Sequence, residues 1–419
     1  MKERKILMEN MAALFIVQGA NYILPLVTFP YLVRVLGLGK FGLIAFAFSF
    51  VQYFVVFVDY GFNLSATRGI SIVRNDFNLI SRKFWNIFII KSALLIISAI
   101  ILSIMIISIE KFKINAFLYL MAFIAVLGNL FFPIWFFQGI EDIKIIAFFN
   151  LISKLFFTAA IFMFIKDQND YTLAVFLQSS GVLFAGIAAF VYALLKYPIK
   201  FVLPNYDEIK TEVKQGWPIF ATIMSSTLVN NSNIFILGIY ADNKIVGIFA
   251  IADKIVRVFI NLCVPVSNAI FPRVSSLFEE SKVKAVKFIK KILLYGSIFF
   301  AAMCVLLYFT ADVLVMLITG ENVKSIGLLI RIMSIVPLTV FVDNLYGTQV
   351  LININRSSQF MKAVLYPGML SVALSFLLVP VWKQYASSVI FVVSELIILV
   401  MMISYVNKNN VYLVKESII

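Results

Sequence analysis

Residues 245–275 read IVGIFAIADKIVRVFINLCVPVSNAIFPRVS, an apolar stretch that is long enough to cross a bilayer and nevertheless carries charge. At about 3.6 residues per turn, Asp253, Arg257 and Asn261 share one helix face. A charge at the bilayer centre costs roughly 2.5–3.5 kcal/mol on insertion scales, so it usually faces a bundle interior or a water-filled cavity. Two interpretations follow. The Asp253–Arg257 pair only locks two helices together, or it forms the charged wall of a transport cavity.

The composition of the chain is that of a membrane protein. Of the 419 residues, 62% are hydrophobic and 13% are charged, whereas soluble chains carry about 25% charged residues. Apolar runs of about 20 residues recur along the whole length, which predicts an all-α polytopic membrane protein. We expect the first helix to be retained rather than cleaved as a signal peptide. About twelve transmembrane helices are predicted, at 11–33, 41–60, 84–108, 114–138, 143–165, 171–195, 215–240, 245–271, 288–311, 326–353, 361–382 and 385–406.

Several kinds of chemistry are excluded by the residues that are missing. The chain has no histidine, which removes histidine-based catalysis and histidine metal sites. Cys263 and Cys304 fall inside predicted helices and are expected to behave as small hydrophobic residues. The run GLGK at 37–40 resembles the end of a phosphate loop, but Arg34 and Phe41 replace residues that such a loop needs. We therefore predict no metal, no cofactor, no bound ATP and no enzyme activity.

The net charge of +14 follows from membrane topology. With the N-terminus in the cytoplasm, cytoplasmic segments carry about 22 of the 35 basic residues and outer loops carry about eight, as the positive-inside rule requires. Both termini are therefore predicted to be cytoplasmic, and the positive charge needs no nucleic acid partner. One basic cluster is expected to lie against anionic lipid headgroups: Lys282, Lys284, Lys287, Lys290 and Lys291.

Charged residues also fall inside the predicted helices. Uncompensated, they would together cost on the order of 20–30 kcal/mol, so some must pair, reach an interface or line water. Lys91 and Asp59 lie near helix ends and could snorkel to the interface. The embedded set is Lys91, Lys154, Lys254, Arg257, Arg331, Asp59, Asp253, Asp343 and Glu395.

The two halves of the chain are similar at a shift of about 205 residues, the signature of a parallel internal repeat. Arg68 aligns with Arg273, and the spacing from Gly42 to Arg68 equals that from Gly247 to Arg273. Each half holds six predicted helices, so both halves run in the same direction around a central cavity. The predicted organisation is a six-helix lobe at 1–195, a polar cytoplasmic linker at 196–214 and a second six-helix lobe at 215–419.

Polar side chains recur at helical spacing on four predicted helices. Such stripes often only join neighbouring helices by hydrogen bonds, but four of them favour a shared polar cavity. The predicted amide lining is Gln18, Asn21, Gln52, Asn230, Asn233 and Asn261. The predicted cationic lining, suited to an anionic ligand, is Arg257, Lys254, Lys154 and Arg331.

Two segments carry a resemblance to a known family: YLVRVLGLGKFGLIAFAFSFVQYFVVFVDYGFNLSATRGISIVRND at 31–76 and PIWFFQGIEDIKIIAFFN at 133–150. Both resemble the polysaccharide-biosynthesis branch of the multidrug/oligosaccharidyl-lipid/polysaccharide exporter superfamily, and specifically the O-antigen flippases of the Wzx type. The resemblance covers the full chain and its MATE-like two-lobe plan. The motif residues and one repeat counterpart are expected to be structural or gating: Gly37, Gly42, Asp59, Gly61, Arg68, Gly139 and Arg273.

The resemblance implies a flippase that moves undecaprenyl-pyrophosphate-linked oligosaccharide from the inner to the outer leaflet of the bacterial inner membrane, for lipopolysaccharide O-antigen biosynthesis. In this interpretation the cations bind the pyrophosphate during alternating access. Asp253, Asp343 or Glu395 could couple the cycle to H⁺ or Na⁺, although Asp253 beside Arg257 should stay ionised. Membrane lipids surround the chain, and an O-antigen polymerase and other glycan-assembly proteins are candidate partners.

Alternative functions remain open at this point. A drug or cation antiporter of the same superfamily should favour acidic and aromatic groups in its site, which the net positive embedded charge opposes. A lipid II-type flippase would use the same chemistry on a different sugar. A membrane-embedded glycosyltransferase or polymerase would need a catalytic carboxylate in a loop, and the short outer loops disfavour it.

Overall fold

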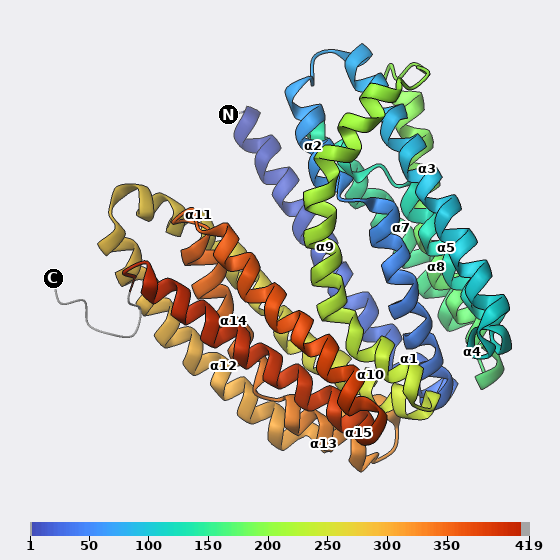
Figure 1. Ribbon diagram of the computed structural model, residues 1–419, viewed down its shortest axis with the longest axis vertical. Coiled ribbons are helices and arrows are strands. Elements are labelled where there is room, and N and C mark those ends of the chain that lie inside the picture. Colours follow the sequence, from blue (N-terminus) through green and yellow to red (C-terminus); the bar gives the residue numbers. More distant parts are fainter. Residues whose placement is uncertain (1, 412–419) are drawn as a thin grey trace. The chain divides into compact units, whose positions relative to one another are not determined.

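The computed structural model describes the backbone of residues 2–411 and the side chains of residues 24–411 except Val229. The described residues form helices and no strand, in agreement with the all-α prediction (Figure 1). Contacts divide the chain into two compact units, Met1–Thr227 and Leu228–Ile419. The division falls inside one helix, α9 (Tyr206–Tyr240).

Helices that are long and apolar enough to cross a membrane occur in both units. Within the described residues there are eight such stretches, so the chain is a multi-pass membrane protein. They are Leu24–Ile72, Phe77–Ser108, Ala116–Gly139, Ile143–Phe164, Gln168–Lys196, Lys282–Thr319, Lys324–Leu351 and Ser357–Lys408. Two of them are far longer than one crossing requires, and the predicted count of twelve helices stays a prediction.

Unit 1 begins with a long helix that contains a break. α1 (Lys2–Asp59) covers the predicted helices 11–33 and 41–60, which meet at Gly37 with φ 72° and ψ 167°. Only glycine adopts such a positive φ without strain, so the motif residue Gly37 has a backbone role there. α1 ends at Asp59, and α2 (Phe62–Ile72) starts after Gly61, which also has a positive φ of 76°.

The next four helices include a second break. α3 (Phe77–Ser108) starts where the Asp76 side chain accepts hydrogen bonds from the backbone N–H groups of Asn78 and Leu79. α4 (Glu110–Ile114) leads into α5 (Ala116–Phe131). Pro133 interrupts the predicted helix 114–138, and α6 (Ile134–Gly139) follows it. Proline has no N–H to continue the helical hydrogen bonds, which explains why α5 ends there.

A close helix crossing in unit 1 joins α5 to α8. α7 (Ile143–Phe164), the short 3₁₀ turn η1 (Gln168–Asp170) and α8 (Tyr171–Lys196) complete this part of the chain. A Cβ at Gly186 would collide with the carbonyl oxygen of Gly128, and one at Gly128 would lie 2.6 Å from the Leu183 backbone nitrogen. Glycine at both positions is therefore what lets the two backbones approach, a common packing device between membrane helices.

The segment predicted as a linker is partly helical. α9 starts at Tyr206, so residues 206–214 continue the helix that was expected to begin at 215. Residues 197–205, which contain two prolines, are not helical. They lie along α3, because the Trp85 indole N–H donates to the Lys200 carbonyl oxygen at 3.1 Å and the Lys200 N–H donates to the Ser81 hydroxyl at 3.1 Å.

Unit 2 contains helices with more internal breaks than predicted. Leu262 separates α10 (Asn243–Asn261) from α11 (Cys263–Glu280), which together form the expected helix 245–271. α12 (Lys282–Thr319) follows. The expected helix 326–353 consists of α13 (Lys324–Met333), α14 (Val336–Asn344) and the π-helical turn η2 (Leu345–Leu351). α15 (Ser357–Lys408) joins the last two predicted helices across Lys383, whose φ is 48°. Cys263 and Cys304 are free, and both are buried, as expected of small hydrophobic residues.

Candidate functional site

Asp253 and Arg257, in the stretch 245–275, share one helix face as their spacing predicts. In α10 the Arg257 Nε donates to the Asp253 carboxylate at 2.7 Å across one helical turn. Arg257 also reaches out of its own helix, since Nη2 donates to the Asn230 carbonyl oxygen of α9 at 3.2 Å. Asp253 is buried, whereas the Arg257 side chain is 33% exposed. The ion pair therefore exists, and the arginine is still accessible.

A cavity of about 250 Å³ opens beside the guanidinium. Its polar lining comes from four segments of unit 2 that are distant in sequence, and the Phe391 ring lies with its centroid 5.5 Å from the guanidinium carbon. The cavity unites one predicted cation with both predicted ion-coupling acids outside α10. The polar residues that line it are Asn230, Arg257, Asp343, Asn344, Thr348 and Glu395.

Asp343 is the unusual member of this lining. It lies near the end of α14, is 7% exposed, and has no hydrogen-bond partner for either carboxylate oxygen within the described part of the chain. A buried carboxylate without donors is strongly destabilising as an anion, so a proton or a cation would stabilise it. Glu395 of α15 is half-buried and interacts electrostatically with both Asp343 and Arg257.

The turn that follows Asp343 positions this carboxylate. α14 passes directly into the π-helical turn η2, and such wide turns are frequent at functional sites. The fully buried Gln349 amide anchors the turn to α11, because its Nε2 donates to the Ser267 hydroxyl at 3.0 Å and to the Ser267 carbonyl oxygen at 3.2 Å. Asn344 and Thr348, which no sequence pattern indicated, enter the lining through the same turn.

The other predicted cations do not line this cavity. Lys254 is exposed on α10. Arg331 of α13 forms an ion pair with Asp312 of α12, with Nη2 and Oδ2 2.6 Å apart. Lys154 is half-buried in α7 of unit 1. The lining thus holds one arginine and two carboxylates, a less positive set than the embedded charges of the whole chain.

The predicted amide lining is distributed over several environments. Gln18 and Asn21 lie outside the described side chains. Gln52 and Asn261 are exposed, and Asn230 lines the cavity. Asn233 is buried and accepts a hydrogen bond from the Ser375 hydroxyl of α15 at 3.5 Å, so it joins two helices.

The motif residues divide into buried and exposed groups. Gly42 is buried, whereas Arg68 and Arg273 are exposed. Gly139 lies against α2, because a Cβ there would be 2.6 Å from the Ile70 side chain. The expectation that Lys91 and Asp59 snorkel is wrong. Lys91 is 1% exposed, and its ammonium lies 3.5 Å from the Asp59 carboxylate, since both groups find partners inside the unit.

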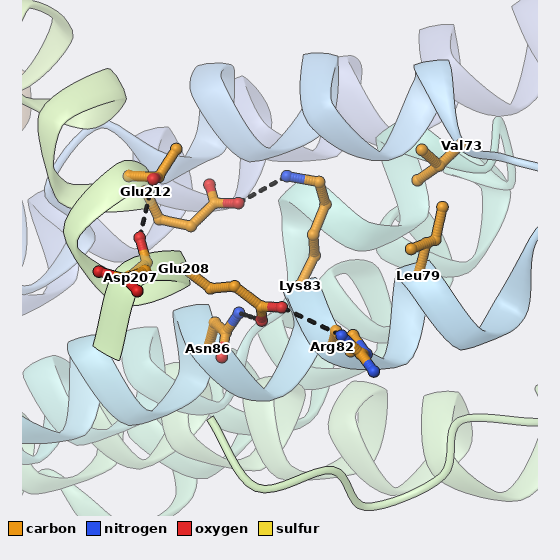
Figure 2. A pocket seen from close by; sticks show the side chains of 9 residues that line it. Val73, Leu79, Arg82, Lys83, Asn86, Asp207, Glu208 and Glu212 are labelled. Carbon is orange, nitrogen blue, oxygen red and sulfur yellow. Dashed lines mark hydrogen bonds and ion pairs between the residues drawn. The ribbon is translucent and has the colours of Figure 1, made fainter. Parts of the chain in front are cut away.

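A second cavity, of about 330 Å³, lies where α3 meets the start of α9 (Figure 2). Figure 2 shows Glu208 accepting from Arg82 and from the Asn86 amide, at 3.3 and 2.7 Å, while Lys83 pairs with Glu212 at 2.5 Å. This network was not predictable from the sequence, because more than 120 residues separate its two sides. The charges compensate one another, so the network anchors α9 to α3.

Known proteins match this chain over most of its length. The protein-family model "Polysaccharide biosynthesis protein" matches residues 7–278. The "Putative O-antigen transporter" of Escherichia coli (strain K12) is 32% identical over 403 residues, which are 96% of this chain and 97% of that protein.

Solved structures also resemble it. "Lipid II flippase MurJ, inward closed conformation" has a TM-score of 0.71 at 14% identity and covers 94% of this chain and 87% of its own. "Inward-facing conformation of a multidrug resistance MATE family transporter of the MOP superfamily" has a TM-score of 0.66 at 13% identity, with coverages of 94% and 96%. At such identities the likeness concerns the fold alone, and it confirms the predicted MATE-like fold.

Proposed function

This chain belongs to the polysaccharide biosynthesis protein family, and on that premise we propose that it is an O-antigen flippase. Its substrate is an oligosaccharide carried on undecaprenyl pyrophosphate, which it moves from the inner to the outer leaflet of the bacterial inner membrane. A protein is needed because moving each hydroxyl from water into hydrocarbon without a hydrogen-bond partner costs roughly 4–8 kcal/mol of free energy on a cyclohexane scale. An oligosaccharide carries many hydroxyls, so unassisted flipping is negligible.

The observation that carries this proposal is the accessible Arg257 beside a cavity inside a multi-pass membrane protein. Asp253 and the Asn230 carbonyl oxygen orient the guanidinium through Nε and Nη2, and the group has further N–H donors on Nη1. Arginine binds phosphate groups in a bidentate manner. Its electrostatic attraction for an anion is strongest where little water is present and the dielectric constant is low. The pyrophosphate binds here.

The size of the cavity limits which part of the substrate it holds. About 250 Å³ is below the range of roughly 300–1,000 Å³ typical of pockets that enclose a whole small ligand. The cavity therefore suits a diphosphate and not an oligosaccharide. In this proposal the sugars and the prenyl chain lie outside it, the sugars in a polar environment and the prenyl chain in lipid.

The two carboxylates couple the cycle to a cation. Asp343 and Glu395 take up H⁺ or Na⁺, which removes negative charge beside Arg257 and strengthens its attraction for the pyrophosphate. When the cation leaves, Glu395 again competes for the arginine and the pyrophosphate is released. Alternating access between the two leaflets then requires the cation to bind and leave on each cycle.

A cation or drug antiporter is the second candidate. The lining has two carboxylates and the Phe391 ring, which are groups that attract an organic cation. Such a substrate would bind Glu395 and Asp343 and would be repelled by Arg257. Removing the arginine should therefore slow transport by a flippase and speed transport by a cation antiporter.

Reconstituted proteoliposomes test the proposal. A fluorescent undecaprenyl-pyrophosphate oligosaccharide reports its leaflet, and wild type is compared with Arg257→Ala, Arg257→Lys and Arg331→Ala at equal protein. We expect Arg257→Ala to slow flipping about 100-fold, because a hydrogen-bonded charge contact is worth about 1.5–3 kcal/mol. Arg257→Lys should retain part of the rate and Arg331→Ala most of it.

The same vesicles distinguish the candidates. Flipping by both wild type and Arg257→Ala would keep the function and remove the pyrophosphate role from Arg257. No flipping by wild type, together with ethidium transport that rises in Arg257→Ala, would replace the flippase by the cation antiporter.

A further inference from the structure

Two helix breaks of unit 1 lie inside stretches that are apolar enough to cross a membrane. The α1–α2 break falls within Leu24–Ile72, and the α5–α6 break falls within Ala116–Gly139. A helix end exposes backbone N–H or C=O groups without intrahelical partners. In an apolar environment these groups must be satisfied by neighbouring protein, so each break needs a local partner.

The α5–α6 break exposes a carbonyl group. Pro133 has no N–H, so it cannot donate to the Asn129 carbonyl oxygen four residues earlier. The backbone N–H of Phe132 reaches that oxygen only at 3.4 Å. The Lys91 ammonium of α3 lies closer, with Nζ 3.0 Å from the Asn129 carbonyl oxygen and 3.5 Å from the Asn129 side-chain oxygen.

The α1–α2 break exposes N–H groups instead. Gly61, which precedes the first residue of α2, has no side chain to cap the helix. The carboxylate of Asp59, the last residue of α1, interacts electrostatically with the backbone N–H of Asn63, in the first turn of α2. A carboxylate is the favoured cap at a helix N-terminus, where the helix dipole is positive.

The two caps are joined to each other. Lys91 Nζ lies 3.5 Å from the Asp59 carboxylate, and the residues are 1% and 9% exposed. An ammonium has three N–H donors, and the three acceptors around it are the carboxylate and the two oxygens of Asn129. Both charges interact favourably with a helix dipole. The Lys91 cation lies at the negative C-terminal end of α5, and the Asp59 anion lies at the positive N-terminal end of α2.

We propose that Asp59 and Lys91 form one shared cap for two broken helices, and that this cap positions α2 and α6 as a single body. The two short helices also contact each other, since the Thr67 hydroxyl lies 3.3 Å from the Trp135 carbonyl oxygen and Gly139 lies against Ile70. The motif residues Gly61, Arg68 and Gly139 belong to this body. Lys91 thus supplies the hydrogen bond that Pro133 removes.

The simpler account makes Lys91 only the counter-ion of Asp59, and neutral double variants separate the two accounts. Asp59→Asn/Lys91→Met and Asp59→Asn/Lys91→Gln both remove the ion pair and differ chiefly in whether position 91 can donate to Asn129. The full-length protein in nanodiscs is measured by thermal unfolding and by hydrogen exchange, which are independent of the transported substrate. The single variant Lys91→Met provides the scale, and its Tm should fall by roughly 10 °C because a buried charge loses its partner.

We expect the double variant with Lys91→Gln to keep most of the wild-type Tm. The double variant with Lys91→Met should stay several degrees lower and exchange amides in peptides 59–66 and 126–139 about tenfold faster than its Lys91→Gln counterpart. A peptide from α8 should exchange equally in both. Equal Tm and equal exchange in the two double variants, or failure of both to fold, would overturn the shared cap. If only the double variant with Lys91→Gln folds, this outcome would support the shared cap.

Discussion

At the residue scale, burial decides what the carboxylates of unit 2 can do. Asp253 is buried but accepts a hydrogen bond from Arg257, and Asp312 is paired with Arg331. Asp343 is as buried as Asp253, and neither of its oxygens has a partner among the described residues. An anion is stable in the first two environments and unstable in the third, so we expect Asp343 to take up a proton or a cation more readily than the other two acids.

Asp343→Asn should therefore uncouple transport from its cation. Asparagine keeps the shape of the side chain but cannot ionise, so it neither takes up a proton nor binds Na⁺ as an anion. We expect wild-type flipping in proteoliposomes to respond to an imposed H⁺ or Na⁺ gradient, and this response to fall at least about tenfold in the variant. Asp312→Asn is the matched control and should keep the response. A full response in Asp343→Asn would move the coupling role to Glu395.

At the scale of elements, the α5–α8 crossing shows a packing constraint made by two glycines. The contacts that a new Cβ would make at Gly128 and Gly186 are with backbone atoms, which cannot rotate away as a side chain would. α5 and α8 lie side by side in unit 1 (Figure 1). Any added atom must therefore separate the two helices and loosen the packing around them.

Gly186→Ala should lower the Tm of the purified protein by roughly 5 °C, because overpacking costs about 1–3 kcal/mol. Gly39→Ala is the control, since a Cβ there meets no atom within 4 Å and the backbone is not in the left-handed region. Alanine at that position should leave the Tm unchanged or slightly raised. Equal Tm shifts for the two variants would show that the close crossing does not limit stability.

At the scale of the whole molecule, the distribution of lysine and arginine predicts the orientation in the membrane. Cys263 and Cys304 are buried, so a membrane-impermeant maleimide should react little with the natural chain. Asn169→Cys should be labelled from outside intact spheroplasts, and Lys284→Cys only after permeabilisation, because the positive-inside rule places the basic cluster in the cytoplasm. Both positions are exposed. Labelling of Lys284→Cys in intact spheroplasts, and of Asn169→Cys only after permeabilisation, would show that the orientation is the reverse of the predicted one.

Features that depend on neighbouring residues were readable from the amino-acid sequence. Hydropathy and helical periodicity are local properties, so the membrane class, the helical segments and the shared face of Asp253 and Arg257 were all predictable. Proline at position 133 and glycine at position 37 have local backbone consequences, and helix ends or breaks occur at both. The family motifs lie on such segments and identify the family without any packing information.

Which charges meet depends on how the helices pack, and the sequence pattern left this open. The helix partner of Arg257 is 27 residues away in the chain, and the acids of its cavity come from α14 and α15. Lys91 reaches Asp59 and Asn129 across three helices, whereas their sequence positions suggested separate contacts with the membrane interface. The physical reason is that a side chain's environment depends on the rotation of its helix against the neighbouring helices. A one-residue rotation moves a side chain by about 100°, which changes its partner without changing the local pattern.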